Sequence, residues 1–197
     1  ANVLHEAAIY PVSQVGIPIN IRNTNDPQAP GTMIVKEVNE PRESGDIIGV
    51  AGQKDFVVIQ IEKALMNSEM GFVRRLLSIL EELHISFAHM PSGIDMVSLV
   101  ILKTELNGKL EQALSLIQER LDPDRVEVVE QIALIATVGQ GLARRYGIAA
   151  RLFNALAEAK INVRMIDQNS GGINLIVGVA NQDFEKAVRA IYQAFVR

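Results

Sequence analysis

The stretch that decides the fold is GFVRRLLSILEELHI at residues 71–85, because the chain repeats it without a gap as GIAARLFNALAEAKI at residues 147–161. Each copy spaces its apolar residues as an amphipathic helix does when it buries one face. A repeat of this kind indicates two copies of one structural module. Identical residues stand at six paired positions: Gly71 and Gly147, Arg75 and Arg151, Leu76 and Leu152, Leu80 and Leu156, Glu82 and Glu158, and Ile85 and Ile161.

The first copy of the module is predicted to contain four strands and two helices. Its apolar patterns indicate strands at residues 56–61, 85–90, 97–102 and 125–129, and helices at residues 71–83 and 110–121. The resulting order is βαββαβ, the ferredoxin-like arrangement. The predicted fold class is therefore α+β.

The second copy follows the same order but is one strand short. Its strands are predicted at residues 132–138, 161–166 and 173–179, and its helices at residues 148–159 and 184–195. A missing fourth strand would leave unpaired backbone groups at the edge of its sheet. The apolar residues 47–51 have the right length to fill that edge. We therefore predict that residues 47–51 supply the fourth strand and that the first module is inserted inside the second.

The composition indicates a folded chain with few groups for covalent chemistry. The 197 residues are 48% hydrophobic and 21% charged, which supports one or two packed cores. Cysteine is absent and the three histidines are scattered, so we expect no disulfide, no metal site and no cysteine nucleophile. The serines and histidines form no recognisable pair of nucleophile and base, which argues against independent catalysis.

Charge and hydropathy argue against nucleic acid and membrane as partners. The formal net charge is -4 and no basic run offsets it, so a phosphate backbone has little electrostatic reason to bind. The longest apolar runs, residues 97–102 and 132–136, fall far short of the roughly 20 residues of a membrane span. No signal-peptide pattern stands at the amino terminus, so we expect a cytoplasmic protein.

The first forty or so residues differ from the rest in holding most of the prolines. Residues 17–22 alternate as a strand does, and residues 23–27 follow with turn chemistry. Residues 40–46 are polar and turn-rich, which is typical of a linker. The amino-terminal segment therefore looks like the edge of another domain.

Motifs in both parts of the chain resemble one family. VLH at residues 3–5, GIPINIRNT at 16–24, DP at 26–27 and PGT at 30–32 resemble the end of the catalytic domain of aspartate kinases. VGQGL at residues 138–142, GIAAR at 147–151, INVRMI at 161–166 and INL at 173–175 resemble the second ACT domain of the same family. The resemblance covers essentially the whole chain.

The resemblance implies a regulatory segment. Residues 1–40 would be the tail of an amino-acid-kinase catalytic domain, 41–54 a linker plus the completing strand, 55–130 the first ACT module and 131–197 the second. The lysine- and glycine-rich phosphate motif of the family does not occur in these residues, so we expect no catalytic residue and no enzymatic activity from this chain. We also expect no cofactor in this chain. ATP and Mg²⁺ would bind only the full-length parent, which would be an ATP-dependent kinase of L-aspartate.

An effector site is predicted where the helix at residues 71–83 begins. A helix amino terminus offers free N–H groups and partial positive charge to an α-carboxylate. Ser68 is the expected cap, Gly71 would allow close backbone approach, and Glu69 or Asp95 would bind the ε-ammonium of lysine. The resemblance also implies ten positions that contact bound lysine in the family: Met66, Glu69, Phe72, Val73, Ser86, Phe87, Ala88, Ser92, Gly93 and Ile94.

Plainer interpretations stand beside this site. The spacing of Phe72 and Phe87 is typical of core residues, Ser92 and Gly93 are also a common turn pair, and His89 fits an ordinary histidine better than a ligand contact. The leading hypothesis is feedback sensing, in which an amino acid, lysine first and threonine second, binds the first module at a homodimer interface. The alternatives are an oligomerisation platform without ligand, and independent catalysis.

Overall fold

The computed structural model describes residues 6–35, 47–139, 142, 145–168 and 172–195. The chain divides into two compact units, residues 1–44 and residues 45–197. Both predicted modules fall in the second unit. No helix among the described residues is long and apolar enough to cross a membrane.

The first unit is small. Helix α1 (Glu6–Gln14) precedes a two-stranded antiparallel sheet of β1 (Ile19–Ile21) and β2 (Thr32–Ile34), which pairs Ile19 with Ile34. The predicted strand at residues 17–22 is therefore shorter than expected. The predicted turn that follows it is present, because the amide of Asn25 donates to Oδ1 of Asn23 over 3.0 Å.

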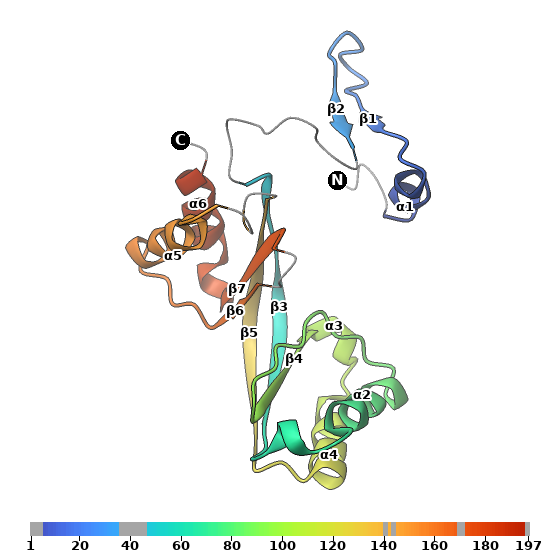
Figure 1. The fold of residues 1–197 in the computed structure, drawn as a ribbon, viewed down its shortest axis with the longest axis vertical. Coiled ribbons are helices and arrows are strands. Elements are labelled where there is room, and N and C mark those ends of the chain that lie inside the picture. The colour runs from blue at the N-terminus through green and yellow to red at the C-terminus, as the bar shows by residue number, and fades with distance from the viewer. Residues whose placement is uncertain (1–5, 36–46, 140–141, 143–144, 169–171, 196–197) are drawn as a thin grey trace. The chain divides into compact units, whose positions relative to one another are not determined.

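The second unit is built on one antiparallel sheet of five strands in the order β4-β3-β5-β7-β6 (Figure 1). Its long central strands are β3 (Gly49–Glu62) and β5 (Arg125–Val138). The shorter outer strands are β4 (Met96–Leu102), β7 (Asn174–Ala180) and β6 (Met165–Asp167).

The two central strands pair with each other along most of their length. Residues 49–53 of β3 pair with residues 134–138 of β5, and residues 56–62 pair with both β4 and the first half of β5. The sequence predicted separate strands at 47–51 and 56–61, and at 125–129 and 132–138. Each pair is instead one strand with an irregularity in the middle, where Asp55 and Gln131 adopt positive φ. A bulge bends a strand without ending it, so the ladder continues.

Two pairs of helices pack on the sheet. α2 (Phe72–Glu82) and α4 (Leu110–Leu121) belong to the first module, and α5 (Ile148–Glu158) and α6 (Phe184–Phe195) to the second. All four occupy the predicted positions to within one residue at either end. Short helical turns lie at η1 (Met66–Ser68), α3 (Lys103–Leu106) and η2 (Asn181–Asp183).

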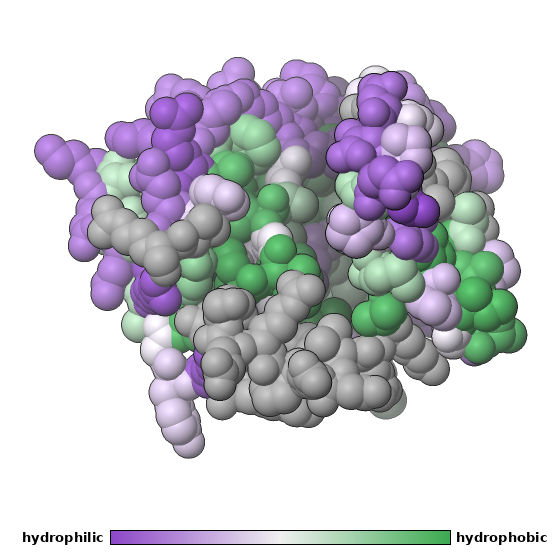
Figure 2. Space-filling view, turned by 90° about the horizontal axis from the view of Figure 1, so that it is seen from above, coloured by the Kyte–Doolittle hydropathy of each residue, from purple (hydrophilic) through white to green (hydrophobic). Residues whose placement is uncertain are grey.

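Each helix pair encloses its own apolar core. Leu76, Ile79 and Ile117 meet Ile59 of β3 in the first core, and Leu152 and Ile191 lie in the second with residues of β5 and β7. Burial of a side chain of this size contributes about 1.5–3 kcal/mol. In the space-filling view of Figure 2, hydrophilic side chains cover much of the visible surface and apolar ones show in separate groups.

A third apolar cluster lies on the sheet face that points away from the helices. Phe56 and Val58 alternate along β3 with residues of the first core, and they meet Val100 of β4 and Ile132 of β5. Met165 of β6 packs against the same cluster. The two modules therefore share a core as well as a sheet.

The sequence prediction was wrong about most of the strand expected after the first helix of each module. Residues 85–90 form no continuous strand and make only an isolated bridge between His89 and Val100, while residues 161–166 contribute only the start of β6. Both segments lie at an outer edge of the sheet, where a strand has one neighbour and its alternation of side chains is weakly enforced. Proline at position 91 also removes a ladder donor.

Candidate functional site

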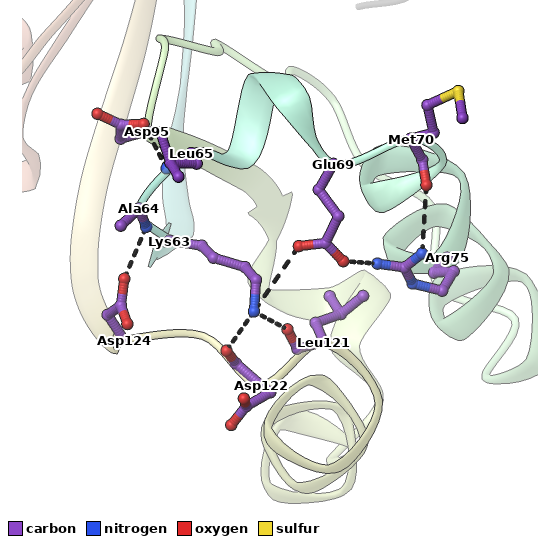
Figure 3. Close-up of polar contacts among 10 residues, drawn as sticks. All are labelled: Lys63, Ala64, Leu65, Glu69, Met70, Arg75, Asp95, Leu121, Asp122 and Asp124. Atoms are coloured by element: carbon purple, nitrogen blue, oxygen red, sulfur yellow. Dashed lines mark hydrogen bonds and ion pairs between the residues drawn. The ribbon is translucent and has the colours of Figure 1, made fainter.

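The loop after β3 lies against the turn before β4, and it brings together the two halves of the predicted site (Figure 3). The amide of Asn67 donates to the carbonyl oxygen of Ile94 over 3.2 Å, and the amide of Lys63 donates to that of Asp95 over 2.9 Å. Oδ1 of Asp95 also accepts the amide of Leu65 over 2.9 Å. Asp95 therefore holds the loop with both backbone and side chain.

The start of α2 differs from the prediction in one respect. The N-cap of α2 is Gly71, with φ of 80°, and no side chain caps the helix. Ser68 lies earlier, in η1, and its hydroxyl donates to Oδ1 of Asn67 over 3.3 Å. The prediction of Ser68 as the cap was wrong because an extra turn separates it from the helix. Gly71 fits this position, since glycine adopts positive φ without a steric cost.

Glu69 is held between two cations in the structure. Its carboxylate pairs with the guanidinium of Arg75, and its Oε2 lies 3.7 Å from Nζ of Lys63. All three side chains are partly shielded from solvent. The Glu69 charge is therefore already balanced within the chain.

Lys63 links the site to the end of α4. Its ammonium donates to the carbonyl oxygens of Leu121 and Asp122 over 2.9 and 2.7 Å (Figure 3). A cation is favourable at a helix carboxy terminus, where carbonyl groups lack partners. Next to it, Oδ2 of Asp124 accepts the amide of Ala64 over 2.6 Å.

Sequence reasoning missed Lys63, Arg75 and Asp124 as members of this network. The contacts of Lys63 and Asp124 join the end of β3 to the end of α4, about sixty positions away, and no local pattern signals them. Arg75 did carry a signal, because it is one of the residues identical between the two copies of the repeat.

The remaining predicted residues divide into buried and exposed groups. Met66 and Phe72 are core residues of the first module, and Val73 packs against that core. Phe87 is 41% exposed, so its predicted alternative role as a core residue was wrong. Seven predicted residues lie exposed on the segment opposite η1, namely Ser86, Phe87, Ala88, Ser92, Gly93, Ile94 and Asp95.

Large apolar side chains are exposed around the site. Met70 is 94% exposed, Leu65 71% and Ile94 68%. Leu65 and Ile94 come from the two segments that the Asp95 contacts join. Contiguous exposed apolar residues mark binding or association surfaces.

The described residues contain no cluster of three or more potential metal ligands. A groove of about 640 Å³ lies elsewhere, between α5 and α6 of the second module, and Ala155, Ala159, Ala190 and Ala194 are among its lining residues. It is distant in the fold from η1 and α2, so it is not the predicted site.

Resolved pKa shifts also fall outside the site. The guanidinium of Arg120 donates to both oxygens of Glu82 over 2.7 and 2.8 Å, which lowers the pKa of Glu82 and raises the pKa of Arg120. A hydrogen bond from Lys54 lowers the pKa of Glu185 in the same way. Both pairs are exposed.

Known proteins resemble this chain over nearly all its length. A family model described as an ACT domain matches residues 135–195. Aspartokinase 3 of Bacillus subtilis is 38% identical over 195 residues, which make up 98% of this chain and 42% of that protein.

Two solved structures share the fold. The aspartate kinase of Clostridium acetobutylicum superposes with a TM-score of 0.91 and 54% identity, over 98% of this chain and 45% of that one. Aspartokinase III of E. coli, in complex with lysine and aspartate in the T-state, superposes with a TM-score of 0.75 and 25% identity, over 99% of this chain and 42% of that one. The chain thus spans less than half the length of these relatives.

Proposed function

We propose, from the premise that this chain corresponds to the carboxy-terminal ACT regulatory region of aspartate kinases, that it binds an end-product amino acid in its first module and so controls an attached kinase. Lysine is the first candidate effector and threonine the second. The kinase would phosphorylate L-aspartate with ATP and Mg²⁺, while this region needs no cofactor. The parent enzyme would act in the cytoplasm.

One observation carries the proposal: the exposed Met70 directly precedes the uncapped start of α2, and the exposed Leu65 and Ile94 lie on the loop that leads to it and on the segment facing that loop. An amino acid needs donors for its α-carboxylate, and the first turn of a helix supplies unpaired N–H groups. Gly71 is the N-cap of that turn, and the cationic side chains of Arg74 and Arg75 lie 3.7–4.0 Å from where its Cβ would stand. Ile94 stands on the facing segment. The aliphatic part of lysine would contact these apolar side chains.

Asp95 is a better partner for the ε-ammonium than Glu69. Glu69 would have to give up contact with Lys63 or Arg75 to receive a ligand cation. Asp95 is exposed, and it uses Oδ1 for the amide of Leu65 while Oδ2 has no hydrogen-bond partner among the described residues. A charge-assisted contact at Oδ2 would distinguish lysine from threonine.

A second copy of the chain is the proposed cover for this surface. Met70, Leu65 and Ile94 expose apolar area that a monomer would leave in water. Association of two first modules would bury it and enclose the ligand. Feedback control then requires that the effector bind one arrangement of the dimer more tightly, with a coupling of about 1–3 kcal/mol.

The proposal includes two interleaved modules, with the first inserted inside the second. Support comes from the pairing of residues 49–53 with residues 134–138, which lie in the second module's half of β5. The chain would then divide into residues 1–40, 41–54, 55–130 and 131–197, as predicted from the sequence.

The alternative is a dimerisation platform without ligand. It is favoured by the internal pairing of Glu69, which leaves the site with less unsatisfied charge than a lysine sensor needs. Under this alternative the apolar surface around Met70 would associate regardless of amino acids.

A thermal titration with each proteinogenic amino acid separates the two. A single-site ligand at 100 times its dissociation constant adds about 2.7 kcal/mol, which raises the midpoint by roughly 5–11 °C for a chain of this size. Lysine should produce this shift, and Asp95→Asn should weaken it, whereas Asp122→Asn should not, because Asp122 contributes its carbonyl oxygen to the network. A dimer that forms without any amino acid, and no midpoint shift with any of them, would favour the platform.

A further inference from the structure

The two outer edges of the five-stranded sheet meet. His89 lies on the segment beyond β4 and Asp167 ends β6 at the other edge of the sheet. Nε2 of His89 is nevertheless 2.9 Å from Oδ2 of Asp167. The contact therefore joins the first module to the second across the open face of the sheet.

The shared apolar cluster explains how the edges come together. Met165, two residues before Asp167, packs against a cluster that contains Val58 and Val100 of the first module. Gly178 leaves room for this approach, since a Cβ there would lie 3.0 Å from Cβ of Met165. Packing of Met165 against this cluster places β6 on the sheet face that also holds Val100, the bridge partner of His89.

The His89 contact is close but poorly formed. Nε2 of His89 is buried, and although Oδ2 of Asp167 is near, the two atoms lack hydrogen-bond alignment; no other partner for Nε2 exists among the described residues. Native structures rarely leave a buried nitrogen in this state, and such a group calls for an explanation. A small movement of either segment would align the pair or separate it.

Both segments are short and lie at edges of the sheet. The His89 segment forms isolated bridges with β4 at His89 and Ser92 and a few backbone hydrogen bonds, such as that from Ala88 to Val100 over 2.8 Å, rather than a continuous ladder, and β6 is three residues long. The same segment carries Ala88, Ser92 and Gly93 of the proposed effector site.

We infer that the His89–Asp167 contact couples the effector loop, residues 86–95, to β6, so that occupancy of the first module changes how firmly the edge of the second is held. The direction of signalling rests on the proposed function, but the coupling itself does not. Coupling between two sites is reciprocal, so loosening either end should loosen the other.

Hydrogen exchange of the whole chain without ligand tests the coupling. His89→Ala should speed exchange of the amides at residues 165–167 by roughly tenfold, and Asp167→Ala should do the same at residues 88–92. The variant that combines both substitutions should exchange at each segment only slightly faster than the single variants do. His84→Asn, at an exposed histidine of the same module, is the matched control and should leave β6 unchanged. If each variant affects only its own segment, the coupling is absent.

His89→Gln serves where His89→Ala does not fold, because it keeps a polar side chain of similar reach. It should speed β6 exchange less than Asp167→Ala speeds exchange at residues 88–92. An unchanged β6 in a folded His89→Gln chain would also count against the coupling.

L-Lysine then tests the signalling. In the unmodified chain it should raise the thermal midpoint and change exchange at residues 86–95 and 165–167. In Asp167→Ala the midpoint shift and the response at residues 86–95 should remain, while the response of β6 disappears. A β6 response that persists would overturn the inference. No midpoint shift in the unmodified chain would refute the lysine assignment alone, since the ligand-free exchange still decides the coupling.

Discussion

Gly52 lies directly beneath the ring of Phe184, so that a Cβ at position 52 would stand 2.6 Å from Cε2 of the ring. The same Cβ would come within 2.7 Å of the carbonyl oxygen of Leu134. β3 can therefore pass under the first turn of α6 only where it lacks a side chain. This contact fixes where the amino-terminal half of β3 sits in the second module.

Gly52→Ala should consequently destabilise the second module. Overpacking against a ring and a backbone carbonyl costs about 1–3 kcal/mol, because neither can move far. Gly49→Ala is the matched control on the same strand, since a Cβ at Gly49 meets nothing within 4 Å. Urea denaturation should show a lower midpoint for Gly52→Ala than for Gly49→Ala. Equal midpoints would mean that α6 does not press on β3.

A substitution at Thr137 should raise the stability of the chain, in contrast to Gly52→Ala. It is fully buried on β5, and its hydroxyl oxygen has no hydrogen-bond partner within the part of the chain that the structure describes. Replacing an unsatisfied buried hydroxyl by a methyl group of the same size removes a desolvation penalty, so Thr137→Val should stabilise the chain by about 1 kcal/mol.

Thr137→Ala is the control for this change, because it removes the hydroxyl and a methyl group and leaves a cavity. Calorimetry should place the midpoint of Thr137→Val above that of the unmodified chain, and Thr137→Ala below Thr137→Val. A lower midpoint for Thr137→Val would show that the hydroxyl has a partner after all.

The helices were predictable from the sequence for a reason visible at their ends. The amide of Ile85 donates to the carbonyl oxygen of Leu80, and that of Ile161 to Leu156, each over 2.9 Å. His84, between the helix and Ile85, has φ of 53°. This is the Schellman arrangement, in which an apolar pair closes the helix end. The identical leucine and isoleucine of the repeat thus encode both the helix and its termination.

The edges and the polar network were less predictable. Residues 85–90 look like a strand because they are apolar, but whether a segment joins a ladder depends on its neighbours, as the isolated bridge at His89 shows. The pairing of Glu69 with Lys63 depends on where β3 ends relative to α2. Such contacts are set by tertiary structure, and one sequence contains no local pattern for them.

Lys63 should matter more to stability than its place in a loop indicates. Its ammonium satisfies two carbonyl oxygens at the end of α4 and faces Glu69. Lys63→Met keeps the length of the side chain and removes these contacts, which should cost about 1–3 kcal/mol. It should also speed amide exchange in the last turn of α4.

Lys103→Met is the control for Lys63→Met, because Lys103 makes an exposed ion pair with Glu130 at 3.3 Å. Exposed pairs contribute about 0–1 kcal/mol, so this variant should unfold at nearly the same urea concentration as the unmodified chain. If both variants lost the same free energy of unfolding, capping of α4 by Lys63 would contribute no more than an exposed ion pair.

The Glu82–Arg120 bridge should make stability depend on pH in the acid range. Because Arg120 lowers the pKa of Glu82 below its usual value of 4.5, the folded state holds the ionised carboxylate more strongly than the unfolded state does. The contribution of the bridge is therefore complete above the usual pKa and is lost as the pH falls through the lower folded value.

Glu82→Gln should lower the thermal midpoint at pH 7, and the difference from the unmodified chain should vanish on acidification through the range below 4.5. Glu158→Gln is the matched control, because Glu158 occupies the same position in the repeat but Ala194 stands on α6 where Arg120 stands on α4. Among the described residues Glu158 has no ion-pair partner, so its substitution should leave the pH profile unchanged. A Glu82→Gln profile parallel to that of the unmodified chain at every pH would show that solvent screens the bridge completely.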